Sequence, residues 1–219
     1  MGSITRGLSN NITTGGVILP AGITNASVAD VTSFSGVTGG GTLVLLSTQT
    51  ASNSATISFT TGLDSTYDMY EFKFINIHPR TDNANFQFNG STDSGSNYNV
   101  TKTSTFFIAY HDEADTANAL QYNGTYDLAQ STSYKSIAPE LGNGADEDAS
   151  GSLQLFNPSS TTYVKHFISR INTYNTGNLS LEVNAAGYCN TTSAVNAIRF
   201  QMSSGNFDGI IKLYGVKKS

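Results

Sequence analysis

The stretch that decides the fold is Met69–Ile77, which reads MYEFKFINI. Its aromatic and β-branched residues alternate with other side chains, as is typical of a β-strand. In an extended strand, successive side chains point to opposite faces of the sheet. Apolar side chains fall on both faces of this stretch, as they also do in Gly209–Val216, GIIKLYGV. Both stretches therefore predict central strands of a sheet, or strands that also contact another subunit.

The same alternation recurs along most of the chain, in segments rich in β-branched and aromatic residues. Most of the segments are separated by Gly, Asn, Asp, Ser or Pro, which turns favour. The strands that we expect are Leu43–Thr48, Ala55–Thr60, Met69–Ile77, Asn85–Asn89, Ser104–Tyr110, Ser152–Asn157, Tyr163–Ile171, Leu179–Ala185, Ala197–Ser203 and Gly209–Val216.

The alternation also predicts which side chains point toward the core. Phe86 and Phe88 should point inward together, and Lys165 should share a face with Phe167. About ten strands without a convincing long helix between them predict an all-β fold of two packed antiparallel sheets. Because the connections in the middle are long, we expect this β-sandwich to be a jelly roll with an extended N-terminal arm.

The middle of the chain, Tyr110–Gly151, has the weakest strand pattern. We expect long loops with short strands there, and one helical turn around Asp112–Leu120. Long loops on a sandwich are common places for binding surfaces.

The first 41 residues differ from the rest, since they are rich in Gly, Thr, Asn, Ala and Val and have a single aromatic residue, Phe34. Such a segment is either a disordered linker or an extended arm that orders against a partner. The regular spacing of small apolar residues favours a docking arm over residues 1–41, followed by a sandwich domain over 42–219. The arm residues that we expect to dock are Ile12, Val17, Ile18, Ile23, Val28 and Val31.

The charge composition argues against nucleic acid as a partner. Charged residues are only 12% of the chain, about half the usual share of roughly 25%. The net charge is −5, and the 11 Lys and Arg residues are scattered, whereas nucleic-acid binding needs clustered cations. The first residues lack the apolar stretch of a signal peptide, and no run approaches the ~20 apolar residues of a membrane span. We therefore expect synthesis in a cytoplasm and no membrane insertion.

No cofactor is predicted. The single cysteine, Cys189, excludes an intrachain disulfide and is expected to be a buried thiol. The three histidines lack the spacing of a zinc site. The acidic segments His111–Asp115 and Asp146–Asp148 could supply oxygen ligands to calcium, but neither matches the twelve-residue calcium loop, and solvated acidic loops are the favoured interpretation.

No catalytic motif appears either. The chain has no Gly-x-Ser-x-Gly elbow, and a glycosidase needs two carboxylates roughly 5–9.5 Å apart, which sequence does not specify. Sugar binding is a better hypothesis, because loop tyrosines can stack on sugar rings. The alternative is that the same tyrosines pack loops or line a subunit interface. The residues in question are Tyr98, Tyr122, Tyr126 and Tyr134.

Four stretches together resemble a known family. They are SITRGLSNNITTGG (3–16), YEFKFINIHPRTDNANFQFNGSTDSGSNY (70–98), LFNPSSTTYVKHFISR (155–170) and GIIKLYGVKKS (209–219). The chain is similar in overall pattern to virion structural proteins of tailed bacteriophages of marine bacteria, cyanophage-like and pelagiphage-like. The resemblance implies a β-sandwich that assembles on the virion as a decoration, head-fibre or tail-fibre-like protein, and it brings no catalytic motif.

We therefore expect a non-enzymatic virion protein, assembled in the host cytoplasm and docked through its arm, with the capsid favoured over the tail. The expected partners are other copies of the chain, with a trimer favoured, and other virion proteins. The alternative is a tail-fibre module for host attachment that binds a receptor or a host-surface glycan. An enzyme that degrades polysaccharide ranks last.

Overall fold

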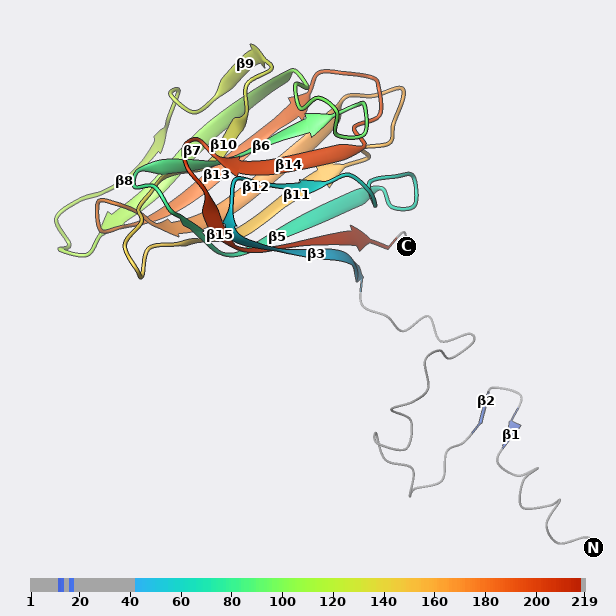
Figure 1. Ribbon diagram of the computed structural model, residues 1–219, viewed down its shortest axis with the longest axis horizontal. Coiled ribbons are helices and arrows are strands. Elements are labelled where there is room, and N and C mark those ends of the chain that lie inside the picture. Colours follow the sequence, from blue (N-terminus) through green and yellow to red (C-terminus); the bar gives the residue numbers. More distant parts are fainter. Residues whose placement is uncertain (1–11, 14–15, 18–41, 218–219) are drawn as a thin grey trace, which may run out of the picture. The chain divides into compact units, whose positions relative to one another are not determined.

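The computed structural model describes residues 12–13, 16–17 and 42–217 (Figure 1). The chain divides into two compact units, Met1–Gly40 and Gly41–Ser219. In the first unit, β1 (Ile12–Thr13) and β2 (Gly16–Val17) form an antiparallel pair with Ile12 opposite Val17. The other four expected docking residues lie outside the described residues, so the docking role of this segment stays a prediction.

Antiparallel strands build the second unit, and each of the ten expected strands is present in it. The all-β prediction is confirmed. The strands are β3 (Leu43–Ser54), β4 (Thr56–Phe59), β5 (Met69–Pro79), β6 (Ala84–Ser91), β7 (Lys102–Asp112), β8 (Asn118–Tyr122), β9 (Leu128–Ser131), β10 (Lys135–Leu141), β11 (Ala149–Phe156), β12 (Lys165–Tyr174), β13 (Leu179–Cys189), β14 (Ala197–Met202) and β15 (Phe207–Val216).

The strands form a small and a large sheet that pack as a sandwich (Figure 1). The small sheet has the order β10-β6-β14-β4, and the large one has the order β3-β15-β5-β11-β12-β13-β7-β8, with β9 also paired to β7. The orders β3-β15-β5-β11 and β4-β14-β6-β10 are those of the two sheets of a jelly roll. The fold is therefore a jelly roll whose large sheet is extended by β12, β13, β7, β8 and β9.

The middle of the chain contains the short strands β8, β9 and β10 between loops, which agrees with the short strands expected in Tyr110–Gly151. The helical turn expected at Asp112–Leu120 is wrong. Strands β7 and β8 form a hairpin there, and the Asp112 carboxylate accepts hydrogen bonds from the backbone N–H groups of Thr116 and Ala117 at 2.8 and 2.9 Å. The carboxylate satisfies backbone donors in the turn, so a helix is not needed to do so.

Aromatic rings from both sheets form the core. Phe200 of β14 lies 5.1 Å and 5.2 Å, centroid to centroid, from Phe72 and Phe74 of β5, in edge-to-face geometry. It also stacks on Phe86 at 5.8 Å. Phe86 and Phe88 are fully buried, as the alternation predicts. Such ring pairs add to the free energy gained from burial alone.

Three lysines are also fully buried in the described part of the chain, Lys102, Lys135 and Lys165. Neutral oxygens accept their hydrogen bonds. Lys102 Nζ donates to Asn89 Oδ1 at 2.5 Å and to the Val100 carbonyl at 2.7 Å. Burial lowers the pKa of Lys102 to about 8 and that of Lys135 to about 7, because the interior disfavours the charged form.

Cys189 lies between two of these lysines, opposite Lys102 on β7 and Lys165 on β12. The thiol is fully buried, as predicted, and burial raises its pKa to about 11. The thiol is therefore neutral near pH 7 and fills space in the core.

Candidate functional site

The large sheet has an inner face, which packs against the small sheet, and an outer face, which points away from it. Strand β12 shows the difference, since Phe167 and Ile171 are buried whereas His166, Ile168 and Arg170 are exposed. This division agrees with the faces predicted for Tyr163–Ile171, including the placement of Lys165 beside Phe167.

The outer face carries most of the large hydrophobic side chains that are exposed in the described residues. Seven of the eight lie there, and only Tyr163, in the loop before β12, does not. Where exposed apolar side chains form a contiguous patch on a soluble domain, the patch often marks an interaction site. The seven are Leu43, Leu45, Ile75, Phe107, Leu120, Tyr122 and Ile168.

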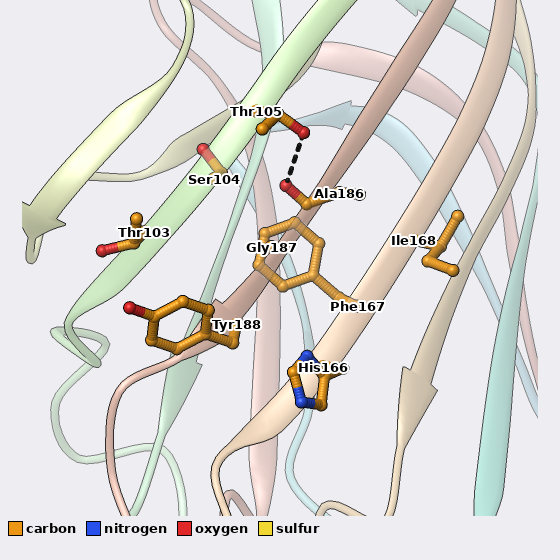
Figure 2. A pocket seen from close by; sticks show the side chains of 9 residues that line it. All are labelled: Thr103, Ser104, Thr105, His166, Phe167, Ile168, Ala186, Gly187 and Tyr188. Atoms are coloured by element: carbon orange, nitrogen blue, oxygen red, sulfur yellow. Dashed lines mark hydrogen bonds between the residues drawn. The ribbon is translucent and has the colours of Figure 1, made fainter.

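A shallow hollow of about 470 Å³ lies on this face, over β7, β13 and β12. Figure 2 shows His166 and Ile168 of β12 on one side of it, Thr103 and Thr105 of β7 on the other, and β13 between them. The floor is low because the outward side chain of β13 between Ile168 and Thr105 is the small Ala186. The next residue, Gly187, faces the core opposite Phe167. A Cβ at Gly187 would lie 2.4 Å from the Thr103 carbonyl oxygen and 2.8 Å from the ring of Phe167, so only glycine fits.

The polar groups around the hollow are largely engaged within the domain. Thr103 Oγ1 accepts hydrogen bonds from the backbone and side-chain N–H groups of Gln130, at 3.1 and 2.7 Å. Thr105 Oγ1 donates to the Ala186 carbonyl at 3.3 Å (Figure 2). The rings of His166 and Tyr188 lie 6.2 Å apart, edge to face. The hollow therefore offers an apolar floor with an aromatic rim, which suits an apolar side chain or the face of a ring.

The hollow lacks the parts of a catalytic centre. Its lining includes no carboxylate, and within the described residues no hydrogen bond joins His166 to a nucleophile or an acid. Nucleophilic catalysis needs a base within hydrogen-bond reach of the nucleophile. The arrangement can hold a partner, but no group in it is placed to activate one.

None of the four tyrosines proposed for sugar binding lines this hollow. Tyr98 and Tyr134 are half-buried near Arg199, whose guanidinium carbon lies 4.0 Å from the centroid of the Tyr98 ring. Burial raises the pKa of Tyr134, and Arg199 opposes that shift. These two tyrosines pack loops against the small sheet.

The other two tyrosines lie near the edge of the large sheet. Tyr122 is exposed on the outer face and donates a hydrogen bond to Asp127 at 2.5 Å. Tyr126 packs on Phe106 at 5.3 Å and donates to Glu140 at 2.8 Å. Burial and then the bond to Glu140 raise the pKa of Tyr126 to about 12. The four tyrosines thus do not gather in one groove, and their role in binding stays a prediction.

The acidic segments take part in turns. His111 Nε2 lies 3.1 Å from Asp115 Oδ1, and Glu147 Oε2 accepts the N–H of Gly144 at 2.5 Å. His78 Nδ1 lies 2.7 Å from the carbonyl oxygen of Glu147, at the end of β5. In the described ranges, no group of three or more His, Cys, Asp or Glu side chains is arranged to hold a metal ion.

The residues of the hollow were not predicted, because they come from three separate segments of the sequence, 103–105, 166–168 and 186–188. The available signal was the outward face of Tyr163–Ile171, where His166 and Ile168 alternate with Phe167. Only the register places Ile168 opposite Ala186, and Ala186 opposite Thr105.

No protein-family model, no curated protein and no solved structure matches the chain. The part of the chain that the structure describes contains no helix long and apolar enough to cross a membrane.

Proposed function

We propose that this chain is a non-enzymatic structural protein on the surface of a tailed bacteriophage particle. In this role it is a capsid decoration or head-fibre protein, assembled in the host cytoplasm and docked through its N-terminal segment. The observation that carries the proposal is the outer face of the large sheet, where seven large hydrophobic side chains are exposed. A contact with other proteins would remove this apolar surface from water.

Three further features support a particle role. The jelly roll is a recurrent fold of viral capsid and lectin domains, which is support by analogy only. The surface has few charges and many hydroxyl and amide groups, which suits close packing against other protein subunits. Four stretches of the sequence, between residues 3 and 219, also resemble the phage family.

A second candidate is a receptor- or glycan-binding module of a tail fibre. The hollow with its His166–Tyr188 rim favours this role, because an aromatic edge above an apolar floor can accept the face of a sugar ring. The engaged hydroxyls of Thr103 and Thr105 argue against it, since few groups remain to bind sugar hydroxyls. A glycan array with the full-length protein tests this candidate, and the first proposal predicts no binding above background.

The test of the first proposal is a binding experiment with particles that lack the chain. Tagged full-length protein is added, and its copies per particle are counted by quantitative mass spectrometry. Saturable binding supports a particle role, whereas no binding by a folded wild-type protein contradicts it.

The docking segment is tested in the same experiment with the double variant Val17→Asp, Ile18→Asp. We expect its occupancy to fall at least tenfold at a protein concentration where the wild type is half-saturated, because charges would replace the apolar contacts. The control is Thr161→Asp in an exposed loop of the sandwich. Full occupancy by the double variant would rule out docking through these residues.

A further inference from the structure

The outer face has a continuous apolar area where β3, β15, β5 and β11 run side by side. Leu43 is opposite Val216, Val216 is opposite Met69, and Met69 is opposite Phe156. In the neighbouring row, Leu45 is opposite Tyr214. Directly opposite residues lie about 4.5–5.5 Å apart on one face of a sheet. We call these six side chains the terminal patch.

The terminal patch is exposed to water in the described domain. Leu43 and Leu45, on the edge strand β3, are 41% and 52% exposed, and the other four side chains are half-buried. The alternation of β5 and β15 explains the patch, because these strands carry apolar residues on both faces and only the inner face is covered by the small sheet. In the described residues, no second layer covers the outer apolar row, whose side chains contact mainly their neighbours on the same sheet.

Charge favours an identical partner for this surface. None of the six side chains is charged. The nearest charged side chains on the face are Glu71, Lys73 and Lys212, of which Glu71 and Lys73 pair with each other at 2.6 Å and Lys212 lies opposite Lys73. A contact between two copies of one surface brings identical groups close together, so unpaired charges there would repel. The terminal patch meets this condition, whereas the area around Arg170, Glu182 and His111 is charged.

The ends of the domain also lie at the patch. The backbone N–H of Lys217 donates to the carbonyl oxygen of Thr42 at 2.9 Å, and Figure 1 shows the start of β3 beside the end of β15. The 41 residues that precede Thr42 therefore leave every copy next to Leu43. Copies joined through the patch would start their N-terminal segments close together, which raises the effective concentration of each segment at a shared docking site.

We propose that the terminal patch is the contact surface between copies of this chain in a closed symmetric oligomer. The inference rests on the proposed function for its use on the particle, while the contact itself is a property of the isolated chain. Burial of the apolar row supplies the free energy of association, and the unpaired edge of β3 lies within the contact.

The test is the molar mass of the full-length protein in solution, measured by light scattering and sedimentation over a range of concentrations. We expect the wild type to be an oligomer at micromolar concentration. Leu45→Lys should weaken association at least tenfold, because it puts like charges into the contact. The matched control is Leu120→Lys on β8, which is 73% exposed on the same face but lies at the opposite edge of the sheet, and it should leave the mass unchanged.

The far-ultraviolet circular dichroism of each variant shows whether it folds. If Leu45→Lys does not fold, Leu43→Lys replaces it, because this side chain also points to water. A monomeric wild type would overturn the inference, whether residues 1–41 of the same copy or another protein covers the patch. An unchanged mass of the folded patch variant, or equal dissociation by Leu120→Lys, would overturn it as well.

The two proposals can fail separately. A monomer that still binds particles would overturn the self-contact and leave the particle role standing. An oligomer that depends on Leu45 but never joins particles would overturn the particle role and leave the self-contact standing.

Discussion

The two faces of the large sheet differ in an unexpected way. The inner face buries Lys102 and Lys165, and β10 of the small sheet that covers it buries Lys135, whereas the outer face exposes large side chains such as Leu45 and Ile168. The strands of the large sheet contribute side chains to both of its faces. A single strand, β12, buries Lys165 and exposes Ile168 three positions later.

Burial in this domain therefore depends first on which face of the strand a residue occupies and on whether a second sheet covers that face, and only then on the polarity of the side chain. The lysines are tolerated inside because carbonyl and amide oxygens accept their hydrogen bonds, and their lowered pKa reduces the cost of the charge. The exposed leucines have no such compensation. The inner face is therefore covered within the domain, and the outer face is the surface where we propose that a partner binds.

The largest expected effect comes from comparing the same substitution, phenylalanine to alanine, in the core and on the outer face. Phe200→Ala removes a ring that contacts Phe72, Phe74 and Phe86 in the core, and should cost about 3–5 kcal/mol of the free energy of unfolding. Phe107→Ala on the outer face, where the ring is 42% exposed, should cost less than about 1 kcal/mol. Urea denaturation measures both, and equal losses would contradict the contrast between the faces.

The next effect tests how the buried lysines are satisfied. Asn89→Ala removes the acceptor of Lys102 and the donor to the carbonyl oxygens of Tyr98 and Thr132, each at 2.8 Å. Because buried polar groups lose their partners, we expect a loss of about 2–3 kcal/mol in the free energy of unfolding. The control is Asn172→Ala, an exposed amide on β12 that bonds to Ser180 Oγ at 3.2 Å, with an expected change below about 0.5 kcal/mol. Similar losses for the two variants would show that the acceptors of Lys102 do not matter.

Stability should also depend on pH through these lysines. The folded pKa is about 7 for Lys135 and about 8 for Lys102, while an unfolded lysine titrates near 10.4. Between these values the unfolded chain binds more protons, so the free energy of unfolding rises with pH. From pH 7 to 8.5 we expect a gain of about 2 kcal/mol, and little change from the lysines below pH 7, where both states are protonated.

Above about pH 8.5 the gain per pH unit should become smaller, because unfolded Cys189 would lose its proton more readily than the buried thiol with its pKa of about 11. The rise should end only near pH 10.4, where the unfolded lysines lose their protons as well. Urea denaturation across this range, repeated for Lys135→Met, provides the measurement. The variant should lose the part of the slope that belongs to Lys135. A wild type whose stability is constant from pH 7 to 8.5 would show that these lysines stay charged inside the fold.

The smallest effect concerns a tyrosine that touches both the core and the surface. Tyr126→Phe removes the hydrogen bond to Glu140 but keeps the ring on Phe106, so we expect a loss of about 0.5–1 kcal/mol. Tyr110→Phe is the control, because no hydrogen bond of its hydroxyl is recorded in the described part of the chain. If the two variants are equally stable by thermal denaturation, the Glu140 bond contributes nothing measurable.

Much of the fold follows from the alternation in the sequence. It predicts the strands that carry Phe72, Phe86 and Phe200, and long connections in the middle favour the jelly roll. It fails at Lys135–Leu141 because KSIAPEL has a proline and charged residues, and five of its seven residues are buried in succession without alternation. Tertiary packing decides that strand, as it often overrides local propensity.

The site was harder to predict than the fold. The alternation along the strand places Lys165 on the same face as Phe167, but the charge of a lysine argues for exposure. The burial of the lysines was therefore not predicted. The hollow and the terminal patch depend on register between strands far apart in the chain, such as Leu43 with Val216. Sequence alternation fixes the face of a residue but not its neighbour across the sheet.

A cryo-electron microscopy reconstruction of an intact phage particle tests the proposed role most directly. We expect this chain on the particle surface, with Leu43, Leu45 and Val216 of each copy covered by another copy and the N-terminal segments in contact with the particle. A particle without this chain, or a chain whose terminal patch faces solvent, would contradict this expectation.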